Sequence, residues 1–454
     1  MVSTRAQRAR LRQPRPVLPY RVGSGRGATE QPNATNDPAE LSPRFWALVV
    51  ATGVAAGLVG IAMIAILHAV QHAAFGYHHG DFEVAVRSTA GSRRIIVLAL
   101  GGLVTGVGWY LIRRFMSDQC SDVDDALWAG DSQLSWRRSS LTSVLSEIAV
   151  GVGASLGQEA APKLLGAASG SVLARWARLS PTQRRLLVAC GGGAGMAAIY
   201  NVPLGGALIT AEVLYGSLSL PVVLPALACS TVATVTGWLY LPNRSTYLHI
   251  PAYHVTAPLA VWSIPAGVVV GLVAVGYVRL IGVVAAHRAA GRWVLIGPAV
   301  AFTLLGLIAL HYPTLLGNGR ELAGPLFLGV GTAGVLVALA VLKPLVTAMC
   351  LGSGAAGGLF TPTLATGALL GAVLGLGWTQ LWHGSPMGAY ALVGAAAMLG
   401  AGLQAPLAGL VLILELTGTS VSLVVPMLAA TVVSTSVARY LDGYSIYSVR
   451  LPAR

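Results

Sequence analysis

The stretch Gly151–Gly166, GVGASLGQEAAPKLLG, decides the fold of this chain. It lies in a strongly apolar region, yet it carries Glu159 and Lys163 together with four glycines and Pro162. Glycine and proline at this density break a membrane-spanning helix, and such a break is tolerated only where protein encloses it. An ionisable side chain at that depth marks a transport path or a site by default.

The break in this stretch predicts an anion site. We expect a helix to restart near Ala160, so that the first backbone N–H groups of that helix have no partner within it. These groups carry a partial positive charge, which favours an anion. The carboxylate of Glu159 would then compete with an anion for one position. The alternative is a re-entrant loop in which Glu159 only caps helix amides.

The composition is that of a polytopic membrane protein. Among 454 residues, 55% are hydrophobic and 10% are charged, and the mean hydropathy is +0.71. A net charge of +13 can indicate nucleic-acid binding. Here the basic residues lie in the tails and between apolar runs, which the positive-inside rule explains better. We therefore expect a multi-pass protein of the plasma (inner) membrane with a cytoplasmic N-terminus, lipid around it and no nucleic-acid partner.

Shifts in composition divide the chain into five parts. Residues 1–44 are polar and basic and predict a disordered cytoplasmic tail. Two apolar halves, 45–241 and 259–441, are separated by a polar, proline-bearing connector at 242–258. Residues 442–454 form a polar C-terminal segment.

Neither the cysteines nor the histidines form a pattern typical of a metal or cofactor site. The four cysteines are far apart and predict free thiols. His68 and His72 stand four residues apart, and His78 and His79 follow, but no carboxylate or cysteine lies at ligand spacing. We interpret these histidines as interfacial, and we expect no metal and no cofactor.

An internal repeat sets the architecture. Asn201–Val213 reads NVPLGGALITAEV, and Gln404–Leu416 reads QAPLAGLVLILEL. A second broken stretch, GSGAAGGLFTP at 352–362, matches the first one in the other half. Broken helices at matching positions of a repeat indicate a transport site between the halves, so we predict an all-α membrane protein of two inverted halves. Three pairs match at the same offset: Pro203 with Pro406, Gly206 with Gly409 and Glu212 with Glu415.

These motifs resemble the CLC family of chloride channels and chloride/proton exchangers, in a divergent prokaryotic form without regulatory C-terminal domains. The resemblance covers the chain from about Phe45 onward. GQEAAP resembles the Gly-Arg-Glu-Gly-Pro motif, which implies that Glu159 gates the pathway. GGLFTP resembles Gly-Gly-x-Phe-x-Pro, which implies that Leu359 and Phe360 offer backbone amides to the anion. NVPLGGALITAE resembles Asn-x-Pro-Leu-x-Gly, and the position of Tyr447 implies a hydroxyl on the central anion.

Several residues depart from the family pattern. Gln158, beside Glu159 and Ala160 in the implied anion site, replaces the arginine of the motif. Lys163 either restores that positive charge or snorkels from its helix. Asp118 stands where the family supplies a serine, and a carboxylate facing an anion is unfavourable. Either the backbone there is re-aimed or this part of the site is degenerate, which leaves the choice of anion open.

The resemblance also bears on proton coupling and assembly. Exchangers of the family carry a glutamate directly after the position of Glu212, where this chain has Val213. Valine binds no proton, so we expect anion flux, of chloride by preference, with weak or absent proton coupling. Glu212 itself points about 100° away on a helix, which favours a structural role like that of Glu415. The alternative is a proton-coupled exchanger of chloride, fluoride or another anion. The resemblance further implies a homodimer with one pathway in each subunit.

An enzyme is a remote alternative. Gly153–Gly157 fits the Gly-x-Ser-x-Gly pattern, with Ser155 as the nucleophile of an intramembrane serine hydrolase. Such an enzyme needs a histidine base at depth in another span. The nine histidines lie mostly at the ends of apolar runs or in connectors. We therefore expect no enzymatic activity.

Overall fold

The computed structural model describes residues 41–77, 82–116, 122–128, 131–418 and 421–451. Within these ranges the regular structure is helical, and the single β-type contact is one isolated bridge between Gly157 and Gly358. Most of the predicted tail, residues 1–40, lies outside the described residues, as do His78, His79 and Asp118.

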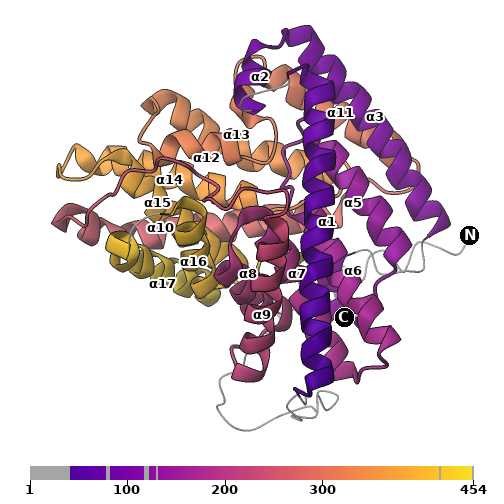
Figure 1. The fold of residues 1–454 in the computed structure, drawn as a ribbon. Coiled ribbons are helices and arrows are strands. Elements are labelled where there is room, and N and C mark those ends of the chain that lie inside the picture. Colours follow the sequence, from indigo (N-terminus) through magenta and orange to yellow (C-terminus); the bar gives the residue numbers. More distant parts are fainter. Residues whose placement is uncertain (1–40, 78–81, 117–121, 129–130, 419–420, 452–454) are drawn as a thin grey trace, which may run out of the picture.

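The first half of the chain runs from α1 to α9 (Figure 1). Its last segment before α9 contains the π-helical turns η2, which carry Glu212 and Val213. The elements are α1 (Pro43–Phe75), α2 (Phe82–Ser88), α3 (Gly91–Phe115), α4 (Val123–Trp128), α5 (Trp136–Gly151), α6 (Ala160–Trp176), α7 (Pro181–Tyr200), α8 (Pro203–Leu208), η2 (Ile209–Tyr215) and α9 (Leu220–Gly237).

The second half begins with α10. The connector before it starts after Gly237, where α9 ends, and therefore earlier than the predicted connector at 242–258. Short 3-10 turns lie between its helices and at its end: η3 (Pro313–Leu315), η4 (Val421–Leu423) and η5 (Ser448–Arg450). The helices are α10 (Ala257–Ala286), α11 (Trp293–Ile308), α12 (Arg320–Phe327), α13 (Ala333–Gly352), α14 (Phe360–Thr379), α15 (Met387–Leu403), α16 (Pro406–Thr417) and α17 (Val424–Leu441).

Seven helices of the described residues are long and apolar enough to cross a membrane: α1, α3, α9, α10, α13, α14 and α17. Four shorter apolar segments accompany them, as expected where membrane helices are broken. The 33 residues of α1 correspond to about 50 Å of helix, which exceeds the ~30 Å hydrocarbon layer and requires a tilt or a projection from it. The prediction of an all-helical, multi-pass membrane protein is confirmed.

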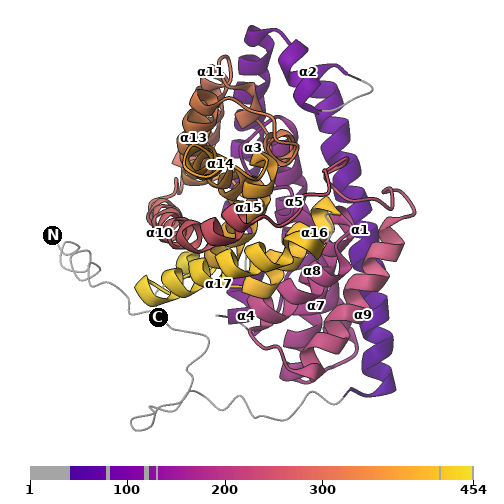
Figure 2. The ribbon, with the colours of Figure 1, turned by 90° about the vertical axis from the view of Figure 1, so that its left-hand side faces the viewer.

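The two halves are interlocked rather than simply adjacent. Helix α11 of the second half packs along α3 of the first half, and α16 packs against α8. Figure 2 shows the yellow helices α16 and α17 crossing in front of the magenta helices α7 and α8. The site between the halves is therefore enclosed by helices of both.

Matching segments of the repeat adopt matching structures. Helices α7 and α15 both end in a left-handed residue, Asn201 with φ 57° and Gln404 with φ 56°. Helices α8 and α16 then begin at Pro203 and Pro406, where the missing N–H group of proline is not needed. The predicted architecture of two inverted halves with broken helices is confirmed.

Candidate functional site

The two glycine-rich breaks meet at one junction. The first break separates α5 from α6, and the second separates α13 from α14. Gly157 and Gly358 pair across the junction, with N–H to O distances of 2.7 Å and 2.8 Å between their backbones. The N-terminal ends of α6 and α14, one from each half, therefore lie at the same place in the molecule.

The carboxylate of Glu159 sits at this junction and is 1% exposed. Its Oε1 accepts a hydrogen bond from the backbone N–H of Phe360 at 2.7 Å. Its Oε2 accepts bonds from the hydroxyls of Thr361 at 3.0 Å and Tyr200 at 3.1 Å. The carboxylate thus lies at the N-terminus of α14, where backbone N–H groups favour an anion.

Glycine is required at the junction because the carboxylate takes the space of a side chain. A Cβ atom added to Gly157 or to Gly358 would overlap the carboxylate of Glu159. Gly153 with φ +108° and Gly354 with φ +95° occupy matching places in the two breaks, in a left-handed region that favours glycine. The glycine pattern of the sequence therefore reflects both the turn of the chain and the room for Glu159.

The structure brings most of the predicted anion-site residues to the junction. Ala160 is the first residue of α6, and Leu359, which is fully buried, directly precedes α14. The side-chain oxygen of Gln158 accepts a hydrogen bond from Asn318 at 2.8 Å, so this oxygen is held by the loop before α12. Asp118 lies outside the described residues, and its place in the site stays a prediction.

Lys163 belongs to a buried ion pair. Its Nζ lies 3.0 Å from Asp124, and the two side chains are 7% and 6% exposed. The same Nζ lies 4.2 Å from the ring centroid of Tyr447, which comes from the segment after α17. The positive charge of Lys163 is thus compensated by Asp124, and the side chain does not snorkel to an interface. The structure gathers Lys163, Asp124 and Tyr447 into one cluster at the first turns of α6.

A second buried lysine was not recognised from the sequence. Lys343 of α13 is fully buried, and its Nζ donates to Ser155 Oγ at 2.9 Å and to the carbonyl oxygen of Gly317 at 3.2 Å. Within the described ranges no carboxylate forms an ion pair with it. Through Ser155, this Nζ contacts the loop that leads to Glu159. The signal in the sequence was a lone lysine in an apolar run.

Ser155, the serine of the Gly-x-Ser-x-Gly pattern, contacts two residues of α13. It is fully buried, and its hydroxyl is engaged by Lys343 and, at 3.2 Å, by Thr347. Both partners lie on α13, so these contacts hold the loop that leads to Glu159 against that helix.

The carboxylates of the repeat are used as helix caps. Glu212 accepts hydrogen bonds from the backbone of Leu407 at 3.4 Å and Ala408 at 2.7 Å. Glu415 accepts them from Leu204 at 3.0 Å and Gly205 at 2.6 Å. Val213, 8% exposed, follows Glu212 without any group that binds a proton.

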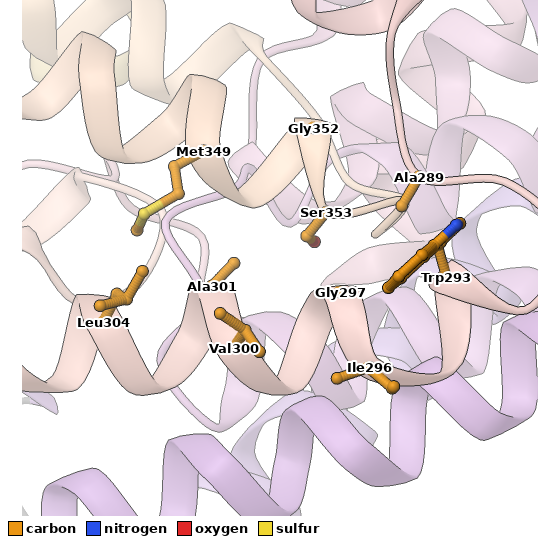
Figure 3. Close-up of a pocket in the computed structure, with 10 residues that line it drawn as sticks. All are labelled: Ala289, Trp293, Ile296, Gly297, Val300, Ala301, Leu304, Met349, Gly352 and Ser353. Atoms are coloured by element: carbon orange, nitrogen blue, oxygen red, sulfur yellow. The ribbon is translucent and has the colours of Figure 1, made fainter.

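A hollow on the outside of the molecule is separate from this site. It has a volume of about 360 Å³ and lies between α11 and α13 (Figure 3). Its lining is almost entirely apolar, and none of its residues contacts Glu159. The lining residues are Ala289, Trp293, Ile296, Gly297, Val300, Ala301, Leu304, Met349, Gly352 and Ser353.

Residues 101–439 match the family model described as voltage gated chloride channel. The voltage-gated ClC-type chloride channel ClcB of Salmonella typhimurium is 32% identical over 423 residues, covering 89% of this chain and 98% of the relative. The H(+)/Cl(−) exchange transporter ClcA of Cronobacter sakazakii is 30% identical over 378 residues, covering 79% of each chain.

Solved structures share the fold over nearly the whole chain. A slow cyanobacterial Cl−/H+ antiporter superposes with a TM-score of 0.78 at 21% identity, covering 90% of this chain and 97% of the other. A CLC-type fluoride/proton antiporter superposes with a TM-score of 0.66 at 22% identity, covering 90% and 98%.

Proposed function

Because the chain belongs to the voltage-gated chloride channel family, known as CLC, we propose that it carries chloride or a similar inorganic anion across the plasma (inner) membrane through a path gated by Glu159. It is a multi-pass membrane protein, with its N-terminus on the cytoplasmic side. Arginines at the ends of α3 and α6 support that orientation by the positive-inside rule.

One observation carries this proposal: the carboxylate of Glu159 rests on the backbone N–H of Phe360. While it is ionised, Glu159 fills the place at the start of α14 that favours negative charge. Protonation removes that charge and weakens the charge-assisted hydrogen bonds that hold the side chain. The side chain can then leave, and an anion can bind the same N–H group. A bound anion in turn disfavours renewed ionisation of Glu159, so anion occupancy and protonation are linked.

The role of protons beyond this gating step separates two candidate functions. The first is anion flux with weak or absent proton coupling, because Val213 cannot relay a proton. The second is proton-coupled anion exchange, and Glu147, a fully buried carboxylate on α5, favours it. The names of relatives at similar identity include both a channel and an exchange transporter.

Purified protein in liposomes tests the anion path directly. Efflux of chloride, nitrate and fluoride is followed with ion-selective electrodes, while a pH electrode records proton uptake in the same vesicles. Chloride or another of these anions should leave the vesicles faster than from protein-free liposomes. Folded protein that moves none of them would refute the proposed function.

A further inference from the structure

Glu147 is a buried carboxylate that the gate described above does not use. It lies on α5, one turn before that helix ends at Gly151, and its side chain is fully buried. Neither carboxylate oxygen has a hydrogen-bond partner among the described residues. Buried polar groups nearly always have such partners, so an acid with both oxygens unpaired needs an explanation.

The face of α5 that carries Glu147 lies against the gate. Ser143 stands one helical turn earlier on the same face, and its hydroxyl donates to the carbonyl oxygen of Ala161 at 3.2 Å. Ala161 lies in the first turn of α6, directly after Glu159 and Ala160. Glu147 is therefore held beside the turn that positions the gating carboxylate.

The charge that acts on Glu147 is that of Glu159. Helix α5 packs against α1, α3 and α6. Three ionisable groups on those helices have partners elsewhere: Lys163 contacts Asp124, Arg113 donates to the backbone oxygens of Ala289 and Gly354, and His68 stacks on the ring of His72. Arg44, Arg93 and Arg94 donate to backbone oxygens. The two glutamates thus form an electrostatic pair in which one member is fully hydrogen-bonded and the other is not.

Such a pair holds one proton in its resting state. An ionised carboxylate without hydrogen bonds in a buried site costs several kcal/mol. Glu159 instead receives three hydrogen bonds that stabilise its negative charge. The proton therefore resides on Glu147 while Glu159 occupies the anion position.

We propose that Glu147 is a second proton-carrying carboxylate of the transport path, which gives its proton to Glu159 and so couples proton movement to anion movement. The inference rests on the proposed function. In the transfer the O–H bond of Glu147 breaks and an O–H bond of Glu159 forms, so the negative charge passes to Glu147. A proton from solution then neutralises Glu147, and an anion takes the N–H group of Phe360.

This route does not use the position after Glu212. Val213 removes a proton carrier from η2, whereas Glu147 lies on α5 beside the first turn of α6. An exchanger that has valine at position 213 therefore still has a proton donor for Glu159 if Glu147 supplies the proton. The inference therefore favours the alternative of a proton-coupled exchanger, with Glu147 in place of an acid at position 213.

The test measures anion efflux and proton uptake together in vesicles clamped at zero potential. Wild-type protein should take up protons as the anion leaves. Glu147→Gln has the shape of the neutral acid but cannot release a proton, so proton uptake should fall by about tenfold or more while anion efflux continues. Ser146→Ala is the matched control, because Ser146 is also buried with an unpaired hydroxyl on α5. It should retain wild-type proton uptake.

Three results separate the inference from the proposed function. Anion efflux without proton uptake in the wild type would overturn the inference and leave the anion path intact. Wild-type proton uptake by Glu147→Gln would do the same. No anion efflux at all would remove the proposed function and the inference with it. If Glu147→Gln does not assemble, Glu147→Asp keeps the proton but shortens its reach, so proton uptake should be slowed; an unchanged rate would overturn the inference.

Discussion

Glu212 caps the helix that leads to Glu415, and Glu415 caps the helix that leads to Glu212. Each carboxylate accepts two backbone N–H groups from the first turn of the partner half's helix. The exchange is symmetrical because the two segments are repeats of one another. It joins the halves where α8 packs against α16.

Removing one of these caps should weaken the fold and leave the transport chemistry unchanged. We expect Glu212→Ala or Glu415→Ala to cost about 1–2 kcal/mol, as for other helix N-caps. Thermal unfolding in mild detergent measures the loss. Glu83→Ala, which removes an exposed ion pair with Arg87, is the control and should change little. A changed ratio of protons to anions in Glu212→Ala with normal stability would contradict a structural role.

Neutralising the gate should abolish its response to pH. Glu159→Gln and Glu159→Ala remove the carboxylate that competes with the anion at Phe360, so anion efflux should no longer depend on pH. Wild-type efflux should rise as the pH falls, because protonation frees the site. Efflux at several pH values in the same vesicle preparation distinguishes these behaviours. Wild-type pH dependence in both variants would exclude Glu159 from gating.

A methyl group at the junction should displace the gate. Gly358→Ala places a Cβ atom on the carboxylate of Glu159, so we expect altered pH dependence of efflux and reduced thermal stability. Gly377→Ala, on α14 and with open space around its Cβ position, is the matched control. It should leave efflux intact and stabilise the helix by up to about 1 kcal/mol. Equal behaviour of the two variants would argue against steric contact with Glu159.

Replacing one partner of the Lys163–Asp124 ion pair should lower the free energy of unfolding more than replacing both. Lys163→Met leaves the carboxylate of Asp124 buried without its partner, at a cost of about 3–5 kcal/mol. Lys163→Met combined with Asp124→Leu removes both charges and should recover most of that stability. The free energies of unfolding of the two single variants and the double variant give the coupling. Additive losses would show that the pair is not coupled.

The homodimer that the family resemblance implies should form through apolar faces of both halves. Helices α9 and α17 expose large apolar side chains, namely Leu220, Leu224, Val425, Leu428 and Val432. Replacing Leu224 and Val432 with tryptophan should disrupt close packing and yield monomers that retain anion efflux. Light scattering in mild detergent gives the mass. A wild-type monomer with full efflux would contradict the dimer.

Local backbone chemistry is the reason that much of the fold could be predicted. Proline and glycine act on their own segment, so Pro203, Pro406 and the glycines around Glu159 marked the helix starts and breaks directly. The matched order of these signals also revealed the repeat. The apolar pattern alone does not mark where α1 ends, because the last turns before Phe75 contain polar residues.

Contacts between distant segments could not be predicted in the same way. The sequence around Lys163 did not indicate that Asp124 would pair with it, because their approach depends on how α4 packs against α6. The hydroxyls of Tyr200 and Thr361 reach Glu159 from two other helices. Glu147 has no spacing motif at all, and only its burial without partners makes it conspicuous.

The backbone pairing of Gly157 with Gly358 has a mechanical consequence. It joins the loop of one half to the helix start of the other by two hydrogen bonds in the interior of the protein. A rocking motion of one half against the other would have to break both bonds at membrane depth, where lipid offers no replacement partners. Transport through the proposed path can keep both bonds if the side chain of Glu159 moves and the two halves stay in place.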